Sequence, residues 1–307
     1  MKNYYLMNSP ELPTPGTHYY TTSKFSNGFK HHGYTVTEAK TLDTITDNAI
    51  VLLSDHGISF NKEVAFQSLR YLAEKCPNTV FICWFYHKYY NEIPFKKFII
   101  TGEHFHKKPV LAEHIFCWDL QNRINNYVPL TFSSSLYPEH IGNLPRNEKI
   151  NGCFIGTSYK PQWVNGLENI VYVSGNQLPE QERIQTFLSS KIAFGFHADA
   201  NVANNVVVER VFEGMAFGCV VISDSPAAAE LTENIVQIAN TKEEFLNIYH
   251  RLLNDDEERR ELQQRGYEWI KRKGLYVHTA KNFLDKCEEL GFTPFLIQNA
   301  HFVGANE

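Results

Sequence analysis

Short apolar runs recur along this chain and alternate with segments of helical periodicity. The run at 49–54 (AIVLLS) is apolar almost throughout, as expected of a strand that is covered on both faces. Strands that alternate with helices form a parallel sheet of the doubly wound type. The sequence therefore predicts an α/β protein.

Two such α/β regions follow one another. Strands of the first region are predicted at 4–7, 34–38, 49–54, 79–85, 97–101 and 115–118, with helices at 17–32 and 64–75. Strands of the second region are predicted at 152–155, 170–173, 192–196, 220–223 and 235–238. Its helices are predicted at 180–189, 205–217, 242–254, 256–273 and 278–290.

The stretch 129–151 separates the two regions, because it is rich in Ser, Pro, Asn and charge and is typical of a linker. The domains predicted on either side are 1–135 and 150–290, followed by a tail at 291–307 that we expect to pack on the first domain. We expect two Rossmann-like domains that face each other across a cleft, with ligands beyond the carboxyl ends of the strands.

Charge and cysteine content exclude several classes of protein. The net charge of −5 and the lack of a Lys/Arg cluster argue against nucleic acid as the main partner. Six cysteines lie far apart, mostly within apolar runs, which suits reduced core thiols in the cytoplasm. No apolar run approaches the length of a membrane span. Oligomeric state leaves no signal in the sequence.

The segment 209–226 (ERVFEGMAFGCVVISDSP) places two charges beside an apolar helical stripe. Asn204 or Asn205 is the predicted helix cap, so Arg210 lies in the first turns of a helix that follows a strand. A helix amino terminus at the carboxyl end of a strand favours phosphate, and an arginine there binds phosphate in a forked manner. Glu213 can accept hydrogen bonds from sugar or ribose hydroxyls, and a plain Arg210–Glu213 pair without a ligand is the alternative.

These residues resemble the donor-binding half of GT-B glycosyltransferases, in particular the subgroup with Arg-x-x-Glu in the donor-site helix, similar to spore-maturation-type transferases. The pieces that carry the resemblance are 192–197, Arg210, Phe212, Glu213, Ala216, Gly218 and 220–224. The resemblance implies transfer of a sugar from a nucleotide-sugar donor, without a cofactor or a metal. Retaining members carry a glutamate eight residues before the position of Glu213, where this chain has Asn205, so the stereochemical outcome stays open.

The resemblance also implies further donor contacts at strand ends. The turn that follows the strand at 152–155 is similar to the family's diphosphate-facing turn. The predicted donor-binding set comprises Gly156, Thr157, Ser158, Lys160, Ser174, Gly175, His197, Arg210 and Glu213.

The first domain is expected to bind the acceptor, a saccharide hydroxyl, and to supply a general base. Candidates at strand ends are Asp55, His56 and Glu103. Two other functions remain open: a nucleotide-sugar epimerase or hydrolase of the same fold, which turns over the donor alone, and a non-catalytic nucleotide-sugar-binding protein. A DNA-modifying enzyme that binds phosphate is disfavoured by the charge.

Overall fold

The computed structural model describes residues 3–7, 27–39, 42–54, 62–84, 95–101, 134, 136–156, 160–174, 178–203, 205 and 207–292. The described residues divide into two compact units: 3–101 together with 279–292, and 134–278. The predicted strand at 115–118 and the tail at 293–307 lie outside the described residues. The return to the first unit comes at residue 279, within a helix, which is earlier in the chain than the expected 291.

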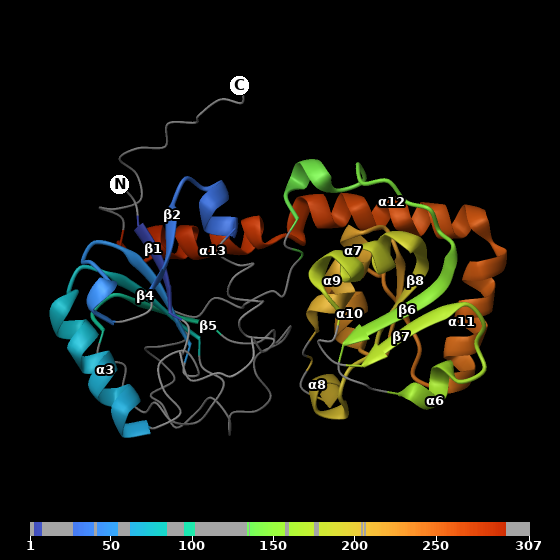
Figure 1. The fold of residues 1–307 in the computed structure, drawn as a ribbon, viewed down its shortest axis with the longest axis horizontal. Coiled ribbons are helices and arrows are strands. Elements are labelled where there is room, and N and C mark those ends of the chain that lie inside the picture. The colour runs from blue at the N-terminus through green and yellow to red at the C-terminus, as the bar shows by residue number, and fades with distance from the viewer. Residues whose placement is uncertain are drawn as a thin grey trace. The chain divides into compact units, whose positions relative to one another are not determined.

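The first unit is built on a parallel sheet with the strand order β2-β1-β3-β4-β5 (Figure 1). Its strands are β1 (Asn3–Met7), β2 (Thr35–Ala39), β3 (Ile50–Ser54), β4 (Val80–Trp84) and β5 (Phe98–Thr101). Its other elements are helix α3 (Lys62–Lys75), a 3-10 turn η1 (Leu42–Thr44), and helical residues 27–31. Val51, Leu52, Phe81 and Ile82 in the central strands are buried, which explains their apolar runs.

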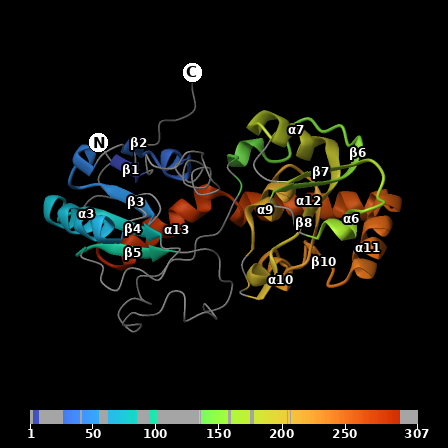
Figure 2. The same cartoon turned by 60° about the horizontal axis from the view of Figure 1, so that its bottom comes forward.

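The second unit is built on a parallel sheet with the strand order β10-β9-β8-β6-β7 (Figures 1 and 2). Read from β7 to β10, this is the same order as in the first sheet. Its strands are β6 (Ile150–Gly156), β7 (Ile170–Ser174), β8 (Ser190–Gly195), β9 (Val220–Ser223) and β10 (Gln237–Ile238). Its helices are η2 (Pro138–His140), α6 (Pro161–Val164), α7 (Glu180–Ser189), α8 (Asp199–Ala203), α9 (Glu209–Ala216), α10 (Pro226–Leu231), α11 (Lys242–Asn254) and α12 (Asp256–Lys273). Helix α13 (Tyr276–Glu289) begins in this unit and continues into the first.

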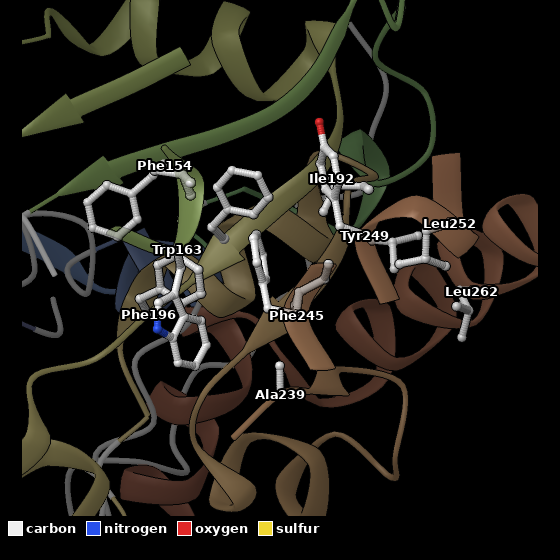
Figure 3. Packing of buried hydrophobic residues seen from close by; sticks show 13 residues of the cluster. Phe154, Trp163, Ile192, Phe196, Ala239, Phe245, Tyr249, Leu252 and Leu262 are labelled. Carbon is white, nitrogen blue, oxygen red and sulfur yellow. The ribbon is translucent and has the colours of Figure 1, made fainter. Parts of the chain in front are cut away.

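Alternate residues of β8 pack on opposite faces of the second sheet. Ile192 and Phe194, with Phe196 after the strand, join the aromatic cluster that includes Phe245 and Tyr249 of α11 (Figure 3). On the other face, small residues let α9 approach closely: a Cβ on Gly214 would lie 2.8 Å from the Cβ of Ala193. Close packing of α9 fixes the position of its amino terminus relative to the strand ends.

The predicted helix at 205–217 is wrong in its first four residues. Helix α9 begins at Glu209, after the N-cap Val208, and the shorter helix α8 precedes it. Asn205 has φ of +56°, a left-handed conformation that interrupts a right-handed helix. As a result, Arg210 is the second residue of α9.

Part of the predicted linker at 129–151 belongs to the second unit. Ile150 and Asn151 form the start of β6, and the guanidinium of Arg146 donates hydrogen bonds to the carbonyls of Ser190 (2.6 Å) and Phe217. Among the described helices, none combines the length and apolarity needed to cross a membrane.

Candidate functional site: the carboxyl ends of β6 and β8

The candidate site lies where the strand order of the second sheet reverses: β7 lies on one side of β6, and β8, β9 and β10 follow on the other. Strands β6 and β8 are neighbours in this sheet, although β7 lies between them in the sequence. In open α/β sheets, ligands bind at such a switch point, outside the carboxyl ends of the strands. The chain leaves β6 at Gly156, and it leaves β8 toward His197 and the start of α9.

The guanidinium of Arg210 lies at this switch point. Its Nη1 donates a hydrogen bond to the carbonyl of Phe196, directly after β8. Its Cζ lies 5.0 Å from the ring centroid of Phe154 on β6, a cation–π contact. Residues of both central strands therefore position this side chain.

Gly156 leaves the space that Arg210 occupies. A Cβ at Gly156 would lie 2.5 Å from Nη2 of Arg210 and 2.9 Å from its Cζ, and the backbone there has φ of +146°. Glycine is therefore required for two reasons, the backbone conformation and the close approach of the guanidinium.

Glu213 lies one turn further along α9 and is 4% exposed. Its carboxylate forms an ion pair with the guanidinium of Arg183 on α7. The helical spacing suggested a pair of Glu213 with Arg210, and Arg183 was not predicted. Arg183 stands in the polar run EQER, where nothing distinguishes it from a solvent-facing residue.

The carboxylate of Asp224 contacts both Lys160 and His197. Asp224 directly follows β9 and is 5% exposed. Its Oδ1 lies 2.7 Å from Nδ1 of His197, and its two oxygens accept the backbone N–H of His197 at 3.0 and 3.1 Å. Its Oδ2 accepts a hydrogen bond from Nζ of Lys160 at 2.5 Å.

Lys160 supplies a second cation close to the ends of β6 and β9. It precedes α6 in the left-handed conformation, with φ of +51°. Its ammonium pairs with Asp224, lies 3.8 Å from Oδ1 of Asp199, and lies 5.2 Å from the ring centroid of Trp163. Its contact with Asp224 places this ammonium next to the residue that follows β9.

Burial and hydrogen bonding set the charges of the His197–Asp224 pair. Burial lowers the pKa of His197 below its ordinary value, with Arg210 and Lys160 acting in the same direction against Asp224. Burial alone would raise the pKa of Asp224, but hydrogen bonds from His197 and Lys160 bring it below its ordinary value. At neutral pH the histidine is therefore neutral and the aspartate ionised.

The structure brings together four of the predicted donor residues: Gly156, Lys160, His197 and Arg210. Glu213 lies on the same helix as Arg210, and Ser174 is the last residue of β7, the strand beside β6. The other predicted residues, Thr157, Ser158, Gly175, Asp55, His56 and Glu103, lie outside the described residues. Among those described, no group of three or more His, Cys, Asp or Glu side chains is arranged to hold a metal ion.

The arrangement suits an anionic ligand. Two cationic side chains and the amino terminus of α9 converge on the ends of neighbouring strands, and the helix dipole adds to their positive potential.

Residues 139–285 match the family model described as glycosyl transferase-like. No curated protein matches the sequence significantly. The sequence resemblance to glycosyltransferases is thus confirmed for the part of the chain that carries the site.

Several solved structures with similar folds are glycosyltransferases. The T4 phage β-glucosyltransferase shares 14% identity with a TM-score of 0.53, covering 97% of this chain and 100% of that one. An α-glucosyltransferase in complex with UDP and a 13-mer DNA shares 9% identity with a TM-score of 0.62, covering 94% and 99%. A glycosyltransferase of Rickettsia africae shares 13% identity with a TM-score of 0.57, covering 94% and 98%. These matches confirm the predicted fold class, the doubly wound α/β architecture of GT-B proteins.

Proposed function

We infer that this protein, a glycosyltransferase of the GT-B fold, transfers a sugar from a nucleotide-sugar donor to an acceptor hydroxyl, and that the second unit binds the donor. The observation that carries this proposal is the position of Arg210. Its guanidinium is fixed by Gly156, Phe154 and the carbonyl of Phe196 at the switch point of the sheet.

The donor diphosphate is proposed to bind Arg210, Lys160 and the amino-terminal amides of α9. Departure of the nucleotide leaves negative charge on the diphosphate, and fixed cations and dipoles stabilise that charge in the transition state. Because two side-chain cations already serve this end, we propose that the reaction needs no bound metal. Activity should then persist in excess EDTA.

Glu213 is proposed to accept hydrogen bonds from donor hydroxyls. Its buried carboxylate is held by Arg183, so its oxygens have a fixed direction. Thr157 and Ser158 follow β6, and Ser174 and Gly175 stand where β7 ends; these are the proposed contacts of the diphosphate and of the nucleoside, respectively.

The first unit is proposed to bind the acceptor and to supply the general base. Asp55 and His56 directly follow β3, which pairs with β1 at the switch point of the first sheet. Glu103 follows β5, at the edge of that sheet and two strands away. The topology therefore favours Asp55 or His56 over Glu103 as the residue that takes the proton of the attacking hydroxyl.

The proposed acceptor is a saccharide hydroxyl, and the proposed location is the cytoplasm. Four described cysteines, Cys76, Cys153, Cys219 and Cys287, are buried free thiols, in keeping with a reducing compartment. One solved relative is in complex with DNA that contains an HMU base, so such DNA is the second acceptor to test.

UDP is the first probe of the donor site, because solved relatives were crystallised with UDP or UDP-glucose. Calorimetric titration with UDP, ADP and GDP should show one preferred nucleotide. Arg210→Ala should weaken binding of that nucleotide by about tenfold to a hundredfold, the effect of losing a charge-assisted contact. Arg265→Ala, the same change at an exposed site on α12, should bind like the wild type. Lack of binding of any nucleotide by the wild type would overturn the proposal.

Turnover separates a transferase from the alternatives. A transferase consumes the sugar nucleotide only when an acceptor is present, whereas an epimerase or hydrolase consumes it alone and a binding protein leaves it intact. Release of the nucleoside diphosphate, measured with and without a panel of oligosaccharides and HMU-containing DNA, distinguishes these cases and identifies the acceptor class.

A further inference from the structure

We propose that His197 and Asp224 are positioning residues that hold the amino terminus of α9, and with it Arg210, in register with Lys160. The proposal rests on the proposed function, because it assigns these two residues to the geometry of the donor-diphosphate site. Neither residue is proposed to touch the donor.

His197 performs a capping task that α9 cannot perform for itself. The backbone N–H of the N-cap residue Val208 donates a hydrogen bond to Nε2 of His197 at 3.2 Å. In a capping box, this N–H is satisfied by a Glu or Gln side chain at the third helical position. In α9 that position is Val211, which is fully buried against the sheet and has no polar atom. A histidine from the end of β8 takes its place.

Asp224 fixes the tautomer that this capping bond requires. Since Nε2 of His197 accepts a hydrogen bond, it carries no proton, and the ring proton is on Nδ1. Nδ1 lies 2.7 Å from Oδ1 of Asp224, to which it donates. The carboxylate thus orients the ring and stabilises the one neutral form that can cap the helix.

The same carboxylate reaches the second cation of the site. Oδ2 of Asp224 accepts from Nζ of Lys160, while the Oδ1 side holds His197. A continuous chain of hydrogen bonds therefore runs from Lys160, after β6, through Asp224, after β9, and His197, after β8, to Val208 at the start of α9. Displacement of any member shifts one of the two cations relative to the other.

Direct contact of His197 with a donor is disfavoured by its surroundings. The residue is 1% exposed, and both ring nitrogens already have protein partners. Its effect on the donor is therefore transmitted through Val208 and α9.

Two substitutions of His197 separate its hydrogen bond with Val208 from its hydrogen bond with Asp224. In His197→Gln, the side-chain carbonyl reaches the position of Nε2 and can accept the Val208 N–H. In His197→Asn, the shorter amide reaches only the position of Nδ1 and can donate to Asp224. If capping of α9 is the function of His197, the Gln variant keeps its affinity for the ligand and the Asn variant loses affinity.

The measurement is calorimetric titration with UDP and, separately, with pyrophosphate, which lacks the base and reports on the diphosphate contacts alone. Thermal midpoints of both variants are recorded in parallel. We expect His197→Asn to weaken both ligands by about tenfold, the effect of one lost hydrogen bond to a charged assembly, and His197→Gln to stay within about threefold of the wild type. Arg265→Ala is the control for an uninvolved charge.

Three results would overturn the proposal. Unchanged binding in both variants, with binding by the wild type, removes the positioning function and leaves the donor site in place. Equal loss of ligand affinity in both variants, in proportion to the fall in their thermal midpoints, would show that His197 has a structural role alone. Absence of UDP, ADP, GDP and pyrophosphate binding by the wild type overturns the proposed function and this inference with it.

If neither variant folds, the tautomer is measured directly in the wild type. Nitrogen-15 spectra of the imidazole should show Nδ1 protonated and Nε2 unprotonated at pH 7.5, both with and without UDP. A protonated Nε2 would contradict the capping of Val208 and overturn the proposal.

Discussion

The lack of a side chain at Gly156 determines where the guanidinium of Arg210 can lie. We predict that Gly156→Ala lowers affinity for the preferred nucleoside diphosphate by about tenfold or more, because the new Cβ displaces a charge-assisted contact. Calorimetric titration measures the effect.

The matched control is Gly166→Ala. Gly166 also has a positive φ, of +88°, but nothing lies within 4 Å of an added Cβ. Both substitutions should cost about 1–3 kcal/mol of backbone strain, and only the one at Gly156 should weaken the nucleotide. Equal binding by the two variants would show that Arg210 does not need this space.

Protonation of His197 should make stability depend on pH. Its folded pKa lies below the ordinary value of 6.5, so the unfolded state binds a proton first as the pH falls. The free energy of unfolding should therefore decline as the pH drops below about 6.5, and the decline should end below the folded pKa. The charged groups that face the imidazole are Asp224, which favours the proton, and Arg210 and Lys160, which oppose it.

Urea unfolding of the wild type and of His197→Gln between pH 7.5 and 5 checks this prediction. The other twelve histidines of the chain titrate in both proteins, so the difference between the two curves isolates His197. A difference that does not change with pH would contradict the prediction.

At the level of single residues, the sequence indicated candidate side chains but not the residues that pair with them. Arg210, Lys160 and His197 were predicted to bind the donor because each follows a predicted strand or lies in the first turns of a predicted helix, and this role stays a prediction. The pairing of Asp224 was not predicted, since its bonds to Lys160 and His197 join positions 64 and 27 residues away. Such pairings depend on the order of strands in the sheet, which periodicity does not reveal.

At the scale of elements, Arg146 anchors the opposite end of α9. Its guanidinium donates to the carbonyl of Phe217, the C-cap of α9, and to those of Phe187 and Ser190 at the end of α7. A cation at a helix carboxyl terminus satisfies free carbonyls and complements the dipole. We predict that Arg146→Met lowers the free energy of unfolding by about 2–4 kcal/mol, because several buried carbonyls lose their donor.

Urea titration monitored by circular dichroism measures this loss, and Arg265→Met on exposed α12 should stay within about 0.5 kcal/mol of the wild type. Well below its unfolding midpoint, Arg146→Met should still bind the preferred nucleotide normally, since Arg146 acts at the far end of α9. Loss of binding without loss of stability would contradict this assignment.

Several element positions were predictable from apolar periodicity and local capping signals. The predicted strand at 220–223 and the helices at 180–189, 242–254 and 256–273 are confirmed to the residue. The side chains of Thr241 and Asp255 cap α11 and α12, and such caps are a local signal in the sequence. The start of α9 has no such signal: its cap is the apolar Val208, and the capping acceptor comes from His197.

At the scale of the whole molecule, two sheets with the same strand order stand in one chain. The sequence predicted parallel strands in both, because apolar runs that alternate with helices are typical of parallel sheets. It did not predict the order, which places β6 beside β8 and β1 beside β3 and so defines the two switch points. Helices such as α9 pack on the sheet through long-range contacts such as Gly214 against Ala193, which periodicity in the sequence does not reveal.

Nucleotide binding should therefore stabilise one unit of the molecule selectively. We predict that saturating nucleotide slows amide exchange in peptides covering 150–156, 190–197 and 207–225 and leaves β3, β4 and α3 unchanged. At a ligand concentration of a hundred times Kd, the binding unit gains about 2.7 kcal/mol, which slows exchange through its global opening by about a hundredfold. Hydrogen–deuterium exchange with mass spectrometry gives the readout, and Arg210→Ala at the same nucleotide concentration should lose the protection. Protection that appears first in the strands of the sheet formed by β1–β5 would instead place the donor in the first unit.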